Sequence, residues 1–302
     1  MHPHLVAVAS AQGGVFTHAQ ALASGYTPRQ VKHRVARGSW VRLRRGVLAD
    51  AQTHAAAAGD PVQAHLLRAS AVVATIGRAA WLSHHSAALA WGIPLIGGIP
   101  RNAAVTIEHQ HRRPADGVEL HTAVTPPQHR GLVDGRPVTS AARTVSDLAR
   151  SRPFAHAVVA ADAALYQRLC TLSDVHAVVA DCPVWPGIAR TKRVLDFVDQ
   201  RAESPGESLS RVAIAAAGLP APDLQVELLL GGRHFRVDFM WPALRLVGEF
   251  DGRVKYRSAD DVWNEKLRED LVRRHDYRVA RWTWADVYPR PDGLLRVLDR
   301  YW

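Results

Sequence analysis

Cysteine is scarce in this chain of 302 residues, which contains only Cys170 and Cys182 and no CxxC pair. The scarcity argues against a disulfide framework and against a thiolate zinc site, so we expect two reduced thiols in a cytoplasmic protein. Long apolar runs are missing as well. No stretch approaches the roughly 20 residues that a membrane-spanning helix needs, and no basic segment precedes the apolar start "HLVAVASAQ". We therefore expect neither a membrane partner nor a signal peptide.

Acidic residues are also missing from the first 49 positions, although the whole chain carries a formal net charge of +10. The same stretch contains these basic side chains: Arg29, Lys32, Arg34, Arg37, Arg42, Arg44 and Arg45. A basic segment of this kind favours a polyanionic partner, and nucleic acid first. The simpler alternative is a basic surface that is merely solvated.

The pattern of residues 1–50 predicts helices followed by a hairpin. "HLVAVASAQ" indicates a first helix, and Thr17 can cap a second over "HAQALAS". In "YTPRQVKHRVARGSW", Thr27 is an N-cap and Pro28 stands at the first helical position, where its missing N–H costs nothing. "WVRLRRGVLA" then alternates apolar and basic residues around a tight turn at Arg44-Arg45-Gly46. This order is typical of a winged helix-turn-helix.

The helix after Pro28 is the expected recognition helix. Val31 and Val35 give it a narrow inward stripe, so its basic residues project elsewhere. Such a helix fits the major groove, and a basic wing neutralises neighbouring phosphates. Gln30, His33 and Arg34 are the candidates for contacts with base edges.

Residues 51–203 form a middle α+β region of unknown role. We expect a linker at "DAQTHAAAAGD", strands at "NAAVTIEH" and "GVELHTAV", and a helix within "AWLSHHSAALAWGIPL". His84 and His85 are adjacent, so on a helix they point about 100° apart and cannot chelate a metal as an i,i+4 pair does. We interpret both as packing or surface residues.

Residues 204–302 predict the order helix, three strands, helix, strand, helix. Ser204 and Pro205 start the first helix, which places Glu207 in its first turn. Two adjacent strands, "HFRVDFMW" and "LRLVGEFD", carry the carboxylates Asp238, Glu249 and Asp251.

Strand alternation puts Val237 and Phe239 on one face and Asp238 on the other, and it separates Phe250 from its acidic neighbours. Three converging carboxylates repel each other by about 4 kcal/mol per pair at ~4 Å and an effective dielectric of about 20. A hard cation such as Mg²⁺ removes that penalty. The alternative is a solvated face on which the acids pair with Arg233, Arg236, Arg245 or Arg253.

The ordered set "RVDFMWPALRLVGEFDG" and "KLREDLVRRHDYRVARWTWADV" resembles a bacterial domain of unknown function related to very-short-patch-repair endonucleases, in the PD-(D/E)XK superfamily. This resemblance covers residues 204–302 and implies a restriction-endonuclease-like α/β core with a mixed sheet. The N-terminal 50 residues resemble the winged-helix domain of AbiEi-type antitoxins. The whole chain is thus expected to be an α/β and α+β multidomain protein.

The nuclease resemblance implies roles for the acids. Asp238 and Glu249 would be Mg²⁺ ligands, the Phe250 carbonyl would supply a third oxygen, and Glu207 would bind through water or orient that water. The sequence departs from the family where the motif lysine is expected, because that position is Asp251.

Other cations would then be needed for catalysis. Lys255 and Lys266 are the options for the cationic role. Arg268 and Arg274, in the charged helix "DDVWNEKLREDLVRRHD", would support the site or hold phosphate. Trp282 and Trp284 alternate on the last strand, where core packing is preferred to stacking on bases.

Two functions from different classes follow. The first is a Mg²⁺-dependent DNA endonuclease that hydrolyses phosphodiesters and is targeted by the winged helix. The alternative is a non-catalytic, antitoxin-like transcriptional regulator whose nuclease fold is inactive, with DNA and a toxin protein as partners. A homodimer is compatible with both, since winged-helix proteins often bind palindromic sites as dimers. A multidomain interaction protein with an incidental basic surface is the plainer alternative.

Overall fold

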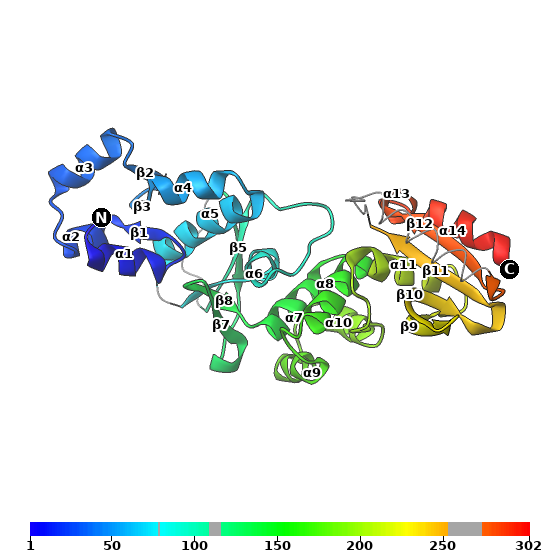
Figure 1. Ribbon diagram of the computed structural model, residues 1–302. Coiled ribbons are helices and arrows are strands. Elements are labelled where there is room, and N and C mark those ends of the chain that lie inside the picture. Colours follow the sequence, from blue (N-terminus) through cyan, green and yellow to red (C-terminus); the bar gives the residue numbers. More distant parts are fainter. Residues whose placement is uncertain (78, 109–115, 253–273) are drawn as a thin grey trace, which may run out of the picture. The chain divides into compact units, whose positions relative to one another are not determined.

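The computed structural model describes residues 1–77, 79–108, 116–252 and 274–302 as a mixed α/β, multidomain protein (Figure 1). Contacts divide the chain into two compact units. The first comprises residues 1–152 and 168–193, and the second comprises residues 153–167 and 194–302. Within the described ranges, no helix combines the length and the apolar character that crossing a membrane requires.

The first unit begins with a small helical segment and a three-stranded antiparallel sheet, ordered β1-β3-β2. Its elements are α1 (Pro3–Ser10), β1 (Val15–Thr17), α2 (His18–Ala23), α3 (Pro28–Ala36), β2 (Trp40–Arg44) and β3 (Val47–Asp50). Thr17 and Thr27 each form a capping box, as the sequence predicts for the two N-caps. Strand β1 is an addition to the predicted order. Three residues are too few to show an alternation, yet Val15 and Phe16 are fully buried.

Aromatic packing closes the core of this segment. The ring of Trp40 lies edge-on to Phe16 and to Tyr26, with ring centroids 4.9 Å apart in both pairs. Val31 and Val35 of α3 pack against the same cluster, which confirms the predicted inward stripe. The opposite side of α3 is therefore free for its polar residues.

A helix replaces the expected linker after this sheet. Residues Ala51–Ala58 form α4, and the Asp50 carboxylate caps it by accepting a 3.0 Å hydrogen bond from the Gln52 backbone N–H. The linker interpretation is therefore wrong. Alanine has the highest intrinsic helix propensity, and a capping aspartate is enough to start such a helix.

A five-stranded mixed sheet forms the rest of the first unit, in the order β6-β5-β4-β8-β7. Its strands are β4 (Ala80–Leu82), β5 (Ala103–Ile107), β6 (Val118–Thr122), β7 (Arg130–Val133) and β8 (Arg136–Thr139). The accompanying helices are α5 (Pro61–Ile76), α6 (His84–Trp91), η1 (Pro127–His129), α7 (Ala141–Ser151), α9 (Leu172–Asp181) and α10 (Ile188–Leu195), the last of which ends in the second unit. Helix α5 packs against strands of both sheets, and this joins the N-terminal segment to the middle region.

His84 and His85 lie in the interior of this unit, with 3% and 0% of their surfaces exposed. His84 stacks on His121 at a ring-centroid distance of 3.6 Å. The Nε2 of His85 bonds the Asn102 carbonyl oxygen at 2.8 Å, and Arg152 Nη2 lies 3.1 Å from its Nδ1. Both residues are packing residues, in agreement with the sequence.

The second unit contains a four-stranded mixed sheet, ordered β12-β11-β10-β9, in which only β11 and β12 pair in parallel. Its strands are β9 (Asp223–Leu230), β10 (Arg233–Trp241), β11 (Leu246–Asp251) and β12 (Arg278–Thr283). Its helices are α8 (Phe154–Tyr166), α11 (Pro205–Ala216), η2 (Pro242–Leu244), α13 (Trp284–Val287), α14 (Asp292–Leu298) and η3 (Asp299–Tyr301). The predicted order holds for the described elements, while the expected helix at "DDVWNEKLREDLVRRHD" lies almost wholly outside the described residues.

Helix α8 joins α11 through a buried ion pair. Asp162 has no exposed surface, and its carboxylate accepts hydrogen bonds of 2.8 Å each from Arg211 Nη1 and Ser208 Oγ of α11. A third bond of 2.8 Å comes from the backbone N–H of Asp199. The ion pair ties a helix of the predicted middle region to the C-terminal sheet domain. The three-domain division at residues 50 and 203 stays a prediction beside this two-unit arrangement.

Candidate nucleic-acid interface and acidic site

Helix α3 presents exposed basic side chains on the face away from its core stripe. Arg29, Lys32, His33 and Arg37 are exposed, whereas Val31 is 4% exposed. Because the helix carries no acidic residue, its outward face carries positive charge without negative charge. This is the charge pattern that the phosphate backbone of a duplex attracts.

Two of the residues expected to reach base edges have roles within the fold. The guanidinium of Arg34 lies over the rings of Tyr26 and Trp40, 5.1 Å and 5.3 Å from their centroids, and the residue is half-buried. The Gln30 side-chain oxygen accepts a 2.8 Å hydrogen bond from the Thr27 N–H and completes the capping box. His33 remains exposed on the same helix.

The β2–β3 hairpin carries the remaining basic residues of the N-terminal segment. Its turn uses Gly46 at a φ of +78°, a left-handed conformation that glycine adopts without strain. Arg42 and Arg45 are exposed, but Arg44 is half-buried. The pairing of β2 with β3 shifts register between Arg42 and Arg44, so the simple alternation predicted for this strand is interrupted there.

In the second unit, Glu207 is a buried carboxylate at the start of α11, with 6% of its surface exposed. It accepts hydrogen bonds from Ser204 Oγ at 2.7 Å, from the Glu203 backbone N–H at 3.0 Å and from Gln225 Nε2 at 2.9 Å. Burial, reinforced by the charge of Asp238, raises the pKa of Glu207, and these three donors oppose the rise. Ser204 is the helix N-cap, so Glu207 has a structural role in addition to any chemical one.

The side-chain amide of Gln225 joins Glu207 to Asp238. Gln225 Nε2 lies 2.9 Å from Glu207 Oε2 and 3.3 Å from Asp238 Oδ1. The other carboxylate oxygen of Asp238 accepts a 3.0 Å hydrogen bond from the Phe250 N–H. Two of the predicted site acids are thus brought to one amide group.

Gln225 is held in an unusual backbone conformation at this point. It stands between the register pairs Val226–Val237 and Leu224–Phe239 of β9 and β10, and its φ is +53°. For a residue that is not glycine, the left-handed region costs of order 1 kcal/mol or more and is often found beside functional sites. The predicted alternation also changes here. Val237 belongs to a cluster with Met240, whereas the Phe239 ring lies 5.1 Å from that of Trp282.

Glu249 is paired with an arginine rather than with the Gln225 amide. Its Oε2 lies 3.4 Å from Arg281 Nη2, its register partner on β12. The Phe250 carbonyl, predicted to be a metal ligand, accepts a 3.1 Å hydrogen bond from the Gly252 N–H. Asp251 is half-buried across from Thr283. Among the described residues, no group of three His, Cys, Asp or Glu side chains is placed to hold a metal ion.

Several further residues of the expected site cannot be placed beside these acids. Lys255, Lys266 and Arg268 lie outside the described residues. Arg274 is described and exposed. Trp282 is a core residue, 1% exposed, whose Nε1–H donates a 2.7 Å hydrogen bond to Ser210 Oγ.

The sequence analysis missed the two residues that organise these acids. Gln225 stands in the apolar strand "LQVELLL", where a lone amide between hydrophobic residues was the available signal. Arg281 stands between Ala280 and Trp282, and its pairing with Glu249 depends on the parallel register of β11 and β12. That register joins segments about thirty residues apart in the sequence, and local patterns do not encode it.

The N-terminal segment matches a known protein family. Residues 5–49 match a family described as "Transcriptional regulator, AbiEi antitoxin". The match covers α1 to β3 and supports an antitoxin-like, DNA-binding transcriptional regulator.

The chain also has curated relatives in Mycobacterium tuberculosis. It is 31% identical over 190 residues to the uncharacterized protein Rv2248 of strain H37Rv, and equally to the uncharacterized protein MT2308 of strain CDC 1551. Each alignment covers 63% of this chain and 69% of the relative. The chain belongs to the family of these proteins. Among solved structures, the RV2827C protein from M. tuberculosis aligns with a TM-score of 0.38 and 15% identity, over 74% of this chain and 83% of that one.

Proposed function

We propose that this protein is an antitoxin-like transcriptional regulator that binds DNA through a winged helix-turn-helix formed by residues 1–50. The observation that carries the proposal is the cationic surface made by α3 and the β2–β3 hairpin, within a stretch whose first 49 residues contain no acidic residue. The family match over residues 5–49 supports the same function.

In this proposal, α3 enters the major groove and the hairpin lies against the flanking backbone. Arg29, Lys32 and Arg37 are exposed and can contact phosphates or base edges, and His33 is a candidate for base contact. Arg34 would support the helix from behind by its stacking on Tyr26 and Trp40. Arg42 and Arg45 of the hairpin would neutralise phosphates beside the groove.

A mobility-shift titration at several salt concentrations tests this assignment. Each phosphate contact contributes about one to the slope of log affinity against log salt, so a double Arg42→Ala/Arg45→Ala variant should lower that slope by about two. Arg190→Ala, which removes an exposed arginine of α10, is the matched control and should leave the slope unchanged. Duplex binding that does not respond to salt would refute the proposal.

The second candidate function is that of a Mg²⁺-dependent endonuclease-like core over residues 204–302. The observation in its favour is the shared amide of Gln225 between Glu207 and Asp238. The described arrangement does not fit the full ligand set expected, because Glu249 faces Arg281 and the Phe250 carbonyl is hydrogen-bonded to Gly252. We therefore derive no catalytic step through a metal.

Magnesium binding by this core is tested most directly by calorimetry of the full chain with Mg²⁺, followed by incubation with supercoiled plasmid. Asp238→Ala should abolish any heat of binding and any nicking, whereas Asp223→Ala, at the exposed start of β9, should abolish neither. Binding of operator-like duplex that is indifferent to Asp238→Ala, without nicking by the unaltered protein, would favour the regulator alone.

Two partners belong to the proposal. An antitoxin-like regulator would bind a toxin protein, and a winged-helix regulator on a palindromic site would act as a homodimer. Light scattering of the purified chain, alone and with a palindromic duplex, would give the oligomeric state. A strictly monomeric 1:1 complex with a palindromic site would exclude the homodimer.

A further inference from the structure

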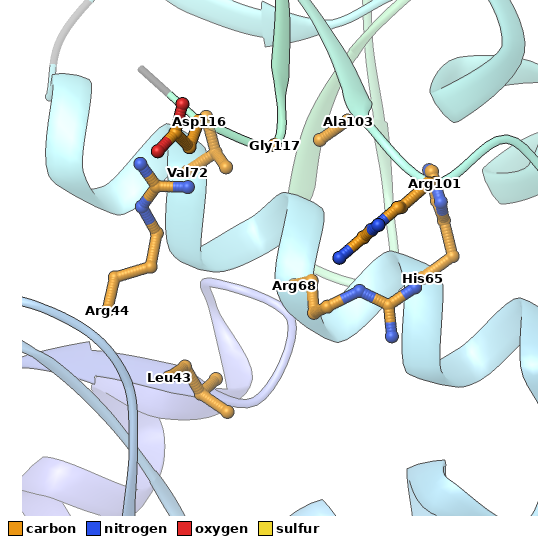
Figure 2. A pocket seen from close by; sticks show the side chains of 9 residues that line it. All are labelled: Leu43, Arg44, His65, Arg68, Val72, Arg101, Ala103, Asp116 and Gly117. Carbon is orange, nitrogen blue, oxygen red and sulfur yellow. The ribbon is translucent and has the colours of Figure 1, made fainter.

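Three arginines from distant parts of the first unit line one small pocket, shown in Figure 2. Arg44 is the last residue of β2, Arg68 lies on α5, and Arg101 lies just before β5. The pocket has a volume of about 220 Å³. None of these residues is adjacent to another in the sequence, so the fold alone brings the three guanidinium groups to one hollow.

Among the described residues that line this pocket, the positive charges outnumber the negative ones. In the described part of the chain, none of the three guanidinium groups forms an ion pair or a hydrogen bond with a protein group. Asp116 supplies the one carboxylate in the lining. Three guanidinium groups with one carboxylate leave two net positive charges, provided that the lining histidine is neutral.

His65 is that histidine; hydrogen bonds hold its ring in place, and burial sets its charge state. Its Nδ1 lies 3.0 Å from the Pro100 carbonyl oxygen, and its Nε2 lies 2.8 Å from Ser86 Oγ. Burial, together with the neighbouring His85 and Arg68, lowers the pKa of His65 to about 4. The ring is therefore uncharged at neutral pH and fixes one wall of the pocket without competing for a ligand.

We propose that this pocket binds a phosphate group. A phosphate monoester carries a charge of about −1.5 to −2 at neutral pH, which matches the net charge of the lining. Planar guanidinium groups bind phosphate oxygens in pairs, and Arg68 and Arg101 are exposed while Arg44 is half-buried. The volume is below the roughly 300–1,000 Å³ of clefts for drug-sized ligands, so it suits a single phosphate group and little beyond it.

The phosphate can come from a soluble phosphate monoester or from the DNA backbone, where each phosphodiester carries one negative charge. Arg44 is the last residue of β2, which belongs to the proposed wing and would lie against DNA. A phosphate of the DNA backbone is therefore one source. Arg68 and Arg101 belong to the middle region. The other source is therefore a soluble effector that binds there and influences the wing through Arg44. Phosphate binding itself does not depend on the chain's binding DNA.

Calorimetry of the full chain with inorganic phosphate, at constant ionic strength and pH 7.5, tests the pocket. Arg68→Ala and Arg101→Ala should each weaken binding by about tenfold or more, since each removes charge-assisted hydrogen bonds. Arg68→Lys should recover part of the affinity, because it restores the charge without the planar fork. Arg190→Ala should bind phosphate as the unaltered chain does. Undetectable binding, or equal binding by all variants, would overturn the proposal.

A second arm separates the two sources. If the phosphate belongs to DNA, inorganic phosphate competes with a labelled duplex, and Arg68→Ala weakens duplex binding and lowers its salt slope by about one. If it belongs to a soluble ester, Arg68→Ala leaves duplex binding unchanged, and adenosine monophosphate binds the unaltered chain at least as tightly as inorganic phosphate does. Circular dichroism of both alanine variants checks that the fold is intact. Failure of duplex binding alone would refute the DNA-binding function and leave the pocket standing.

Discussion

The buried ion pair between α8 and α11 should dominate the stability of the second unit. Replacing Asp162 by alanine removes a carboxylate that accepts three hydrogen bonds and faces Arg211, whose side chain is 11% exposed. Removing one partner of a buried ion pair typically costs about 3–5 kcal/mol, because the other charge stays buried without compensation. We expect the free energy of unfolding of this unit to fall by that amount.

Arg201 provides the matched control in the same unit. It lies 2.7 Å from Asp199, a contact as short as that of Arg211, but its side chain is 57% exposed. Exposed ion pairs contribute about 0–1 kcal/mol, so Arg201→Ala should be nearly neutral. The contrast isolates burial as the cause, because both variants remove one charged member of an aspartate–arginine pair.

Hydrogen exchange of the full chain measures both variants. Amides of α11 report on the second unit, and amides of α7 serve as an internal reference in the first. Measurements at pH 7.5 keep Asp162 ionised, since burial, opposed by Arg211 and by the hydrogen-bond donors, raises its pKa to about 6. If protection in α11 falls by less than about 1 kcal/mol in Asp162→Ala, or equally in Arg201→Ala, the reasoning is refuted.

Two further predictions concern pH and packing. Burial lowers the pKa of His65 to about 4 and that of His84 to about 3, so below pH 6.5 the unfolded chain binds protons that the folded chain does not. The free energy of unfolding of the first unit should therefore be highest above pH 6.5 and fall as the pH drops toward 4. Urea unfolding between pH 7.5 and 4.5 would measure this decrease. The decrease should be smaller in His65→Gln, and a decrease equal to that of the unaltered chain would contradict the argument. Gly206→Ala should destabilise the second unit by about 1–3 kcal/mol in thermal unfolding, because its Cβ would lie 2.0 Å from Phe250 ring atoms. Gly59→Ala, whose Cβ has 3.8 Å to its nearest neighbour, is the control, and equal stability of the two variants would contradict the packing argument.

Local chemistry was sufficient to predict the helix starts and most strands. Thr27 and Ser204 cap the helices that begin beside them, as their patterns indicate. Capping depends on residues three or four positions apart, so a short window contains all the information. The helix α4 was missed for a related reason, since an alanine-rich segment resembles a linker unless its capping aspartate is given weight.

Long-range arrangements were beyond the sequence. The Gln225 amide joins Glu207 to Asp238, whereas Glu249 pairs with Arg281 on another strand. The strand register decides which neighbouring strand a side chain contacts, and the register is set by tertiary pairing. The pocket of Arg44, Arg68 and Arg101 gives no local signal at all.

Each of the two units is built from two separate segments of the chain. Residues 153–167 belong to the second unit and residues 168–193 return to the first, so the backbone passes between the units three times. A fragment that starts at residue 204 therefore leaves α8 behind and exposes the partners of Asp162. Neither unit can be excised as one continuous piece, and a recombinant version of the sheet domain would need residues 153–167 reattached through a new linker.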